Sequence, residues 1–171
     1  MNELDLRAAY EDLLRRYVAA LRRLAWSYVR DGGEDLFQEI AMALWTALPR
    51  FRGDSSERTW VYRVAHNTAI SFMSTGRRRA QREIVDEAPY EPASLASVEA
   101  DLIERERRAR MWTGVRALPI LDRQIITMHL EGLSAAEVSS VTGVSAIAVA
   151  TRLTRIRQRL INEIRGNEGD S

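Results

Sequence analysis

Apolar residues recur at steps of three and four along most of this chain, which is the spacing of one face of an α-helix. The first stripe covers about four turns and consists of Leu13, Leu14, Tyr17, Val18, Leu21, Leu24, Ala25 and Tyr28. The second consists of Phe37, Ile40, Ala41, Leu44 and Leu48. The third consists of Trp60, Val61, Val64, Ala65, Ala69, Phe72 and Met73. The pattern therefore predicts three amphipathic helices in the first half of the chain.

Local signals set the ends of these predicted helices. Asp31-Gly32-Gly33 ends the first, and Pro49 stops the second. Asp54, with Glu57 three residues later, resembles a capping box and predicts the start of the third helix. Gly76 is expected to end that helix.

The second half of the chain predicts four further helices and no strand. A charged helix runs from Val98 to Leu118 and stops at Pro119. The other three are expected at residues 122–130, 135–142 and 146 to about 164. Ser134 and Ser145 are expected N-caps of the last two, and Gly143 is expected to take the positive φ of the turn between them.

The last two predicted helices form a helix-turn-helix, a motif whose second helix enters the major groove of DNA. One side of the long helix is apolar and would face the core: Val149, Leu153, Ile156, Leu160 and Ile164. The opposite side is polar and Arg-rich: Thr151, Arg152, Thr154, Arg155 and Arg159. Arg can bind guanine edges or phosphates. The alternative is a helical hairpin whose Arg face is merely solvated.

Residues 81–98 separate the two helical blocks and predict a flexible acidic linker. They hold Pro89 and Pro92 and have more acidic than basic residues, whereas both flanking blocks have a small excess of Arg. We therefore predict an all-α fold of two small domains, residues 1–80 and 99–166, with a tail at 167–171. The second domain contains the helix-turn-helix.

The composition narrows the class of protein. The 25 basic residues are all Arg, there is no Cys, and the two His, His66 and His129, lie far apart. Disulfides, thiolate catalysis and Cys-type zinc sites are excluded, and a His-based metal site is disfavoured. We find no catalytic carboxylate pair, nucleophile–base pair or phosphate-binding Gly loop, so we expect neither an enzyme nor a cofactor. No long apolar run or signal peptide is visible, so we expect a cytoplasmic protein without membrane insertion.

Two further clusters of residues suggest binding surfaces. Acidic and polar residues share one face of the second predicted helix: Glu34, Asp35, Gln38, Glu39 and Met42. Such a face suits a basic protein partner, although a solvated charged face is the alternative. The loop from Pro49 to Ser56 is small, polar and basic, and it is followed by Trp60, Tyr62, Arg63, His66 and Asn67. Aromatic rings and Arg can stack on exposed bases, and Asn can read a base edge.

Taken together, these motifs resemble the extracytoplasmic-function group of bacterial RNA polymerase sigma factors. Asp35-Leu36-Phe37-Gln38-Glu39 is similar to the family's D-L-x-Q-E segment. Residues 51–67 are similar to its F-R-G-x-S-x-x-T-W-L-Y-R-I-A-x-N stretch. Leu118-Pro119, Asp122-Arg123-Gln124, Glu131-Gly132-Leu133-Ser134 and Arg152-Leu153 are similar to its second domain. These motifs follow the family's order over most of the chain.

The resemblance implies a promoter-specificity subunit that binds core RNA polymerase through the β′ clamp and the β flap, and that also binds promoter DNA. An anti-sigma factor is a further candidate partner. The implied clamp-binding residues are Asp35, Leu36, Gln38, Glu39 and Met42. The implied −10 DNA residues are Arg52, Gly53, Asp54, Ser55, Ser56, Arg63, His66 and Asn67. Among them, the loop from Arg52 to Ser56 would hold a flipped nontemplate base. The implied −35 DNA residues are Ser145, Ala146, Ala148, Thr151, Arg152 and Arg155.

Four features depart from the family's pattern. Ser71 to Ser74 carry less charge than is usual, and Ser139 and Thr142 replace apolar residues in the first helix of the helix-turn-helix. The other two keep further hypotheses open. His66 stands where Arg is common, and the start of the recognition helix, residues 146–150, is poor in polar side chains. One alternative is a helix-turn-helix regulator that binds duplex DNA without polymerase. Another is an adaptor or decoy that binds polymerase but has lost promoter reading.

Overall fold

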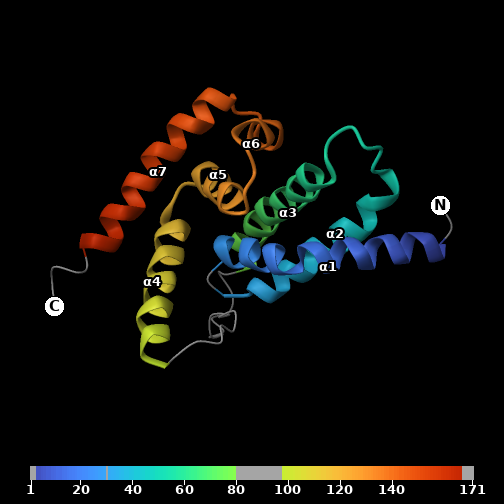
Figure 1. Ribbon diagram of the computed structural model, residues 1–171. Helices are drawn as coiled ribbons and strands as arrows, with labels where there is room; N and C mark the ends of the chain where they lie inside the picture. The colour runs from blue at the N-terminus through green and yellow to red at the C-terminus, as the bar shows by residue number, and fades with distance from the viewer. Residues whose placement is uncertain (1–2, 30, 80–97, 167–171) are drawn as a thin grey trace. The chain divides into compact units, whose positions relative to one another are not determined.

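The computed structural model describes residues 3–29, 31–79 and 98–166, and these residues form seven α-helices, one short 3-10 helix and no strand (Figure 1). The predicted all-α fold is therefore confirmed. The chain divides into two compact units, Met1–Pro89 and Tyr90–Ser171. The predicted linker, apart from Val98, and the predicted tail lie outside the described residues.

The first unit is a three-helix arrangement. It contains α1 (Glu3–Tyr28), α2 (Gly33–Ala47), the 3-10 helix η1 (Leu48–Arg50) and α3 (Glu57–Arg79). Helix α2 packs against both α1 and α3. The predicted stripes meet in the core, whose fully buried members include Leu21, Leu24, Leu36, Ile40, Leu44, Val61, Ala65 and Ala69. Burying these side chains on three helices at once fixes α2 between its neighbours.

Two predicted ends of α3 are wrong. Ser56, not Asp54, caps the helix: its Oγ accepts a hydrogen bond of 3.1 Å from the backbone N–H of Thr59. The N-cap oxygen must reach the amides of the first helical turn, and Ser56 stands directly before Glu57, the first helical residue. At the other end, α3 continues through Gly76 to Arg79, because an isolated glycine weakens a helix by only about 1 kcal/mol.

The second unit contains α4 (Val98–Ala117), α5 (Ile120–Leu130), α6 (Ala135–Thr142) and α7 (Ala146–Gly166). Helix α7 packs against the other three. The predicted apolar side of α7 is confirmed at Val149, Leu153, Ile156 and Leu160, all of which are buried, while the side chain of Ile164 lies outside the described residues.

The helix-turn-helix, α6 and α7, has the predicted bounds and caps. Ser134 and Glu137 form a complete capping box at the start of α6. Gly143 follows α6 with a φ of 75°, in the left-handed region that favours glycine. The Oγ of Ser145 accepts a hydrogen bond of 3.3 Å from the amide of Ala148 at the start of α7. The turn is thus fixed by residues close together in sequence.

Candidate protein- and nucleic-acid-binding surfaces

The exposed face of α2 carries most of the residues predicted to bind protein. Asp35, Gln38 and Glu39 are exposed, and Met42 is 64% exposed. Leu36 is 0% exposed, which corrects the prediction that it contacts a partner. Leu36 lies on the buried side of the helix with Ile40, one turn away, so its role is to hold α2 against the core.

The start of α2 is fixed by two contacts with α1. The carboxylate of Glu34 accepts a hydrogen bond of 3.1 Å from Arg22, so this member of the predicted acidic face is paired within the unit. A Cβ atom at Gly33 would lie 2.3 Å from the indole ring of Trp26. The backbone of α2 therefore approaches the Trp26 ring more closely than any other residue type allows, and this contact sets where Asp35 lies.

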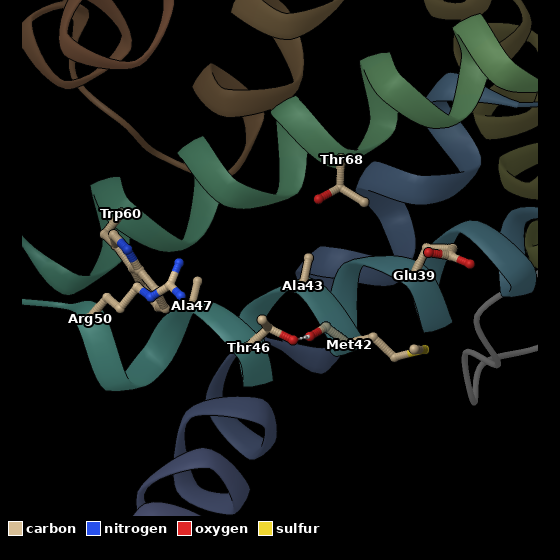
Figure 2. A pocket seen from close by; sticks show the side chains of 8 residues that line it. All are labelled: Glu39, Met42, Ala43, Thr46, Ala47, Arg50, Trp60 and Thr68. Atoms are coloured by element: carbon tan, nitrogen blue, oxygen red, sulfur yellow. Dashed lines mark hydrogen bonds between the residues drawn. The ribbon is translucent and has the colours of Figure 1, made fainter.

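A groove of about 520 Å³ runs between α2 and α3 (Figure 2). Its lining residues are Glu39, Met42, Ala43, Thr46, Ala47, Arg50, Trp60 and Thr68. Figure 2 shows Arg50 and Trp60 together at one end and Glu39 at the other. The groove thus joins the exposed face of α2 to the start of α3.

The loop between η1 and α3 presents polar groups to solvent. Arg52, Gly53 and Asp54 are exposed, and Gly53 has a φ of 77°. The ring of Phe51, the first residue of this loop, lies with its centroid 4.9 Å from that of the Trp60 ring on α3. Trp60 is therefore half-buried beside the loop instead of in the core, where its apolar stripe placed it.

Helix α3 exposes only part of the predicted DNA-binding set. Asn67 is exposed and Arg63 is half-buried. His66 is 0% exposed, which corrects the prediction that it contacts DNA. Its Nδ1 lies 2.6 Å from the hydroxyl of Tyr28 on α1, and burial lowers the pKa of the imidazole to about 3. His66 is therefore a neutral core residue.

On α7 the predicted DNA-binding residues are in unequal positions. Ser145, Thr151 and Arg155 are exposed, while Ala146 and Ala148 are half-buried. The set is thus only partly available to a ligand that lies against the outer side of the helix.

Arg152 differs from the other polar residues of α7. Its Nη1 donates a 2.6 Å hydrogen bond to Oδ1 of Asp122 on α5, within a partly buried ion pair. The pattern of the sequence placed Arg152 on the free polar side of α7, so this pairing changes the expected role. Arg152 holds the recognition helix against α5.

Sequence reasoning missed two residues of this unit. Ile147 is 82% exposed on the first turn of α7, and Asp122 is the partner of Arg152. Ile147 could have been found from the helical wheel, since it lies about 160° around the helix from buried Val149 at 100° per residue. Asp122 was noted only as part of a family-like motif, and its pairing with Arg152 carried no local signal because the two residues lie 30 apart in the sequence.

The described residues contain no group of three or more His, Asp or Glu side chains that could hold a metal ion. None of the helices in the described ranges has an apolar stretch that could span a bilayer.

Comparison with known proteins identifies both units. The model of Sigma-70 region 2 matches residues 13–80, and the model of Sigma-70, region 4 matches residues 108–160. The ECF RNA polymerase sigma-E factor of Escherichia coli (strain K12) is 30% identical over 165 residues, with 91% of this chain and 86% of that protein covered. This chain belongs to the extracytoplasmic-function sigma factors.

A further relative and two solved structures are also similar to this chain. The sigma-E factor of Haemophilus influenzae is 28% identical, with 91% of this chain and 87% of that protein covered. The fold is similar to that of the sigma factor RpoE from Bartonella quintana, solved in complex with the anti-sigma factor NepR. That match has a TM-score of 0.72 and 21% identity, and covers 92% of this chain and 97% of the other. CnrH, solved with the cytosolic domain of CnrY, matches with a TM-score of 0.65 and 24% identity over 96% and 91% of the two chains.

As a sigma factor, this chain gives RNA polymerase its promoter specificity, with a region 2 unit followed by a region 4 unit. A regulator that binds duplex DNA without polymerase is set aside, because residues 13–80 match a sigma region that such a regulator does not require.

Proposed function

We propose that this sigma factor binds core RNA polymerase through the exposed face of α2 and opens the −10 element with the loop after η1. The observation that carries the proposal is the division of α2 into two sides. Asp35, Gln38 and Glu39 face solvent, while Leu36 and Ile40 are fully buried. The polar residues are therefore not needed for the core and are free to bind a partner.

The chemistry of this face suits a basic protein surface with an apolar centre. Two carboxylates would attract and orient such a surface. Met42 is a flexible and polarizable side chain that adapts to an apolar partner, and it is 64% exposed. We assign the face formed by Asp35, Gln38, Glu39 and Met42 to the β′ clamp of the polymerase.

The loop at Arg52–Ser56 is assigned to the nontemplate strand of the −10 element. Flipping a base out of a duplex costs a few kcal/mol, and stacking on an aromatic ring returns about 1–3 kcal/mol. Phe51 and Trp60 form such an aromatic surface beside the loop, and the groove of Figure 2 reaches Trp60 and Arg50. Exposed Asn67 and half-buried Arg63 supply hydrogen-bond donors on α3.

The second unit is assigned to the −35 element and to the β flap. Exposed Thr151 and Arg155 lie on the recognition helix of a complete helix-turn-helix. This sigma factor would then act by binding alone, while the polymerase performs the chemistry. Because it works with the polymerase, we place it in the cytoplasm.

An anti-sigma factor is proposed as a further partner. RpoE of Bartonella quintana is solved with the anti-sigma factor NepR, and CnrH with the cytosolic domain of CnrY. A regulator of this kind would compete with core polymerase for the sigma factor. Co-purification of this chain with the product of a neighbouring gene, followed by displacement with core polymerase, tests the assignment.

Charge reversal on α2 tests the main proposal. Asp35→Arg with Glu39→Arg should abolish binding to core polymerase in a pull-down and transcription in a run-off assay. The melting temperature should change little, since surface substitutions alter stability by about 0.5 kcal/mol or less.

The matched control reverses two exposed acidic residues of α1, Glu11→Arg with Asp12→Arg. Both are in exposed ion pairs, which contribute little to stability. The control should bind core polymerase like the parent protein. If the α2 variant also binds normally, the face is only a solvated surface and the proposal fails.

A further inference from the structure

The outer side of the first turns of α7 is apolar, although it belongs to the helix assigned to DNA. Ile147 is 82% exposed, the highest value among the large apolar residues described. Ala150 beside it is also exposed. Ile147 lies away from Val149 and Leu153, which face the core, and Ala150 lies at the edge of this outer side. Because its side chain is exposed to solvent, Ile147 contributes little to the packing of the unit.

The polar groups of the same turns are largely engaged within the protein. The hydroxyl of Thr151 donates a 3.0 Å hydrogen bond to the carbonyl oxygen of Ile147, and that of Thr154 donates one of 3.2 Å to Ala150. Arg152 is paired with Asp122. This outer side therefore presents methyl groups and few free hydrogen-bond donors.

The surroundings of Ile147 favour DNA over protein as the ligand. The flanking side chains, Ala146 and Ala148, are small, so the helix is narrow where it would enter a groove. Farther along the same helix, Arg155 and Arg159 are exposed and can bind phosphates. Ile147 would then contact the base edges in the groove, while Arg155 and Arg159 would contact the phosphates beside it.

We propose that Ile147 recognises the C5-methyl group of thymine in the major groove of the −35 element. The proposal rests on the proposed function of α7. The thymine methyl is the apolar feature that the major groove presents, and apolar side chains distinguish T·A pairs by contacting it. The alanine-rich helix then distinguishes base pairs by apolar contact with the thymine methyl group instead of by hydrogen bonds. Thr151, one turn from Ile147, adds a side-chain methyl group to the same surface.

Deleting single methyl groups from the DNA tests this contact. Holoenzyme assembled from the full chain and core polymerase first selects promoters from a library with a randomised −35 element. The selected duplexes should carry thymine on one strand at a fixed position. Replacing that thymine by uracil should weaken the closed complex about fourfold, the effect of burying one methylene-sized group.

The substitution Ile147→Ala completes the test. It should weaken the closed complex on the thymine duplex by a similar factor and remove the difference between thymine and uracil. Ile161→Ala is the matched control, since Ile161 is 42% exposed on the same helix about 21 Å farther along. It should keep the full response to uracil.

The outcomes separate this inference from the proposed function. If the holoenzyme transcribes the selected promoters but ignores both uracil and Ile147→Ala, the inference is wrong and the proposed function stands. Selected elements without thymine on either strand would also refute it. If Ile147→Ala weakens binding to core polymerase, the residue docks on protein and the inference is wrong. A holoenzyme that selects no promoter overturns both.

Discussion

The hydroxyl of Tyr28 and the Nδ1 atom of His66 lie 2.6 Å apart inside the first unit and connect α1 to α3. Both side chains are buried, and the rings meet edge to face with centroids 5.6 Å apart. Asn67, assigned to the −10 DNA, directly follows His66. This buried pair therefore fixes the rotation of α3 that turns Asn67 toward solvent.

Tyr28→Phe should lower the free energy of unfolding by about 1–3 kcal/mol. The substitution removes the partner of a buried imidazole without changing the shape of the core, and an unpaired buried polar group costs roughly that amount. Urea unfolding followed by circular dichroism measures the change. Tyr10→Phe is the control: it removes a part-buried hydrogen bond of 3.0 Å to the carbonyl of Ala41 and should cost less. Equal losses would mean that the Tyr28–His66 pair has no special weight.

The first unit should become less stable as the pH is lowered below about 6.5, and His66 is the cause. Burial lowers its pKa in the folded protein to about 3, whereas an exposed imidazole in the unfolded chain has a pKa of about 6.5. Between these values the unfolded chain binds a proton that the folded protein does not. The free energy of unfolding therefore decreases by up to about 1.4 kcal/mol per pH unit as the pH falls through this window.

Comparison with His66→Leu isolates this effect from the titration of the carboxylates. The variant should show a shallower dependence of the unfolding free energy on pH between about 3 and 6.5. His129→Gln serves as the control, because His129 lies in the other unit and is only partly buried. If His66→Leu and the parent protein have parallel pH profiles, the imidazole is not held neutral by the fold.

Gly33→Ala should destabilise the first unit by about 1–3 kcal/mol, the usual cost of overpacking. The new Cβ would lie 2.3 Å from the Trp26 ring, so the ring or the start of α2 must move. Core-polymerase binding should weaken as well, since Asp35 follows two residues later. Gly53→Ala is the contrasting variant: its Cβ would meet no atom within 4 Å, although its φ of 77° strains any other residue. Thermal unfolding and intrinsic Trp fluorescence measure both. Unchanged fluorescence in Gly33→Ala would contradict the close contact.

Arg152 and Arg155 should have different effects on promoter binding. Arg152→Ala and Asp122→Asn each break the ion pair between α7 and α5, and should each lower stability by about 0.5–1 kcal/mol because the pair is partly exposed. Neither should change −35 sequence preference. Arg155→Ala should weaken the closed complex. It should also reduce, by about one, the slope of the logarithm of the binding constant against the logarithm of the salt concentration. Promoter affinity measured over a series of salt concentrations distinguishes the two arginines. A reduced slope for Arg152→Ala would place Arg152 on the DNA.

Replacing the Arg52–Ser56 loop with Gly-Ser, or changing Asn67 to Ala, should slow strand opening about tenfold while the closed complex still forms. Either change leaves polar groups of the flipped base without hydrogen-bond partners, and each such group costs about 1–3 kcal/mol. Permanganate footprinting reports opening, and run-off transcription on premelted templates should restore activity. A defect that persists on premelted DNA would show that the loop acts after opening or in polymerase binding.

The sequence by itself determined the features that depend on neighbouring residues. The bounds of α6, its N-cap Ser134 and the glycine turn before α7 agree with the structure, because caps and positive φ values are properties of a few consecutive residues. The buried side of α7 followed from its helical spacing in the same way. The exposed side of α2, with Asp35, Gln38 and Glu39, was also readable, since the apolar stripe left it free.

Only the tertiary structure decided which polar residues remain free. His66 and Arg152 each looked available in the helical pattern, but their partners, Tyr28 and Asp122, lie 38 and 30 residues away in the sequence. Ser56 displaced Asp54 as the cap of α3, since the start of that helix was placed two residues too early. A hydrogen bond between helices depends on how their surfaces pack, and that information is not contained in the periodicity of either helix.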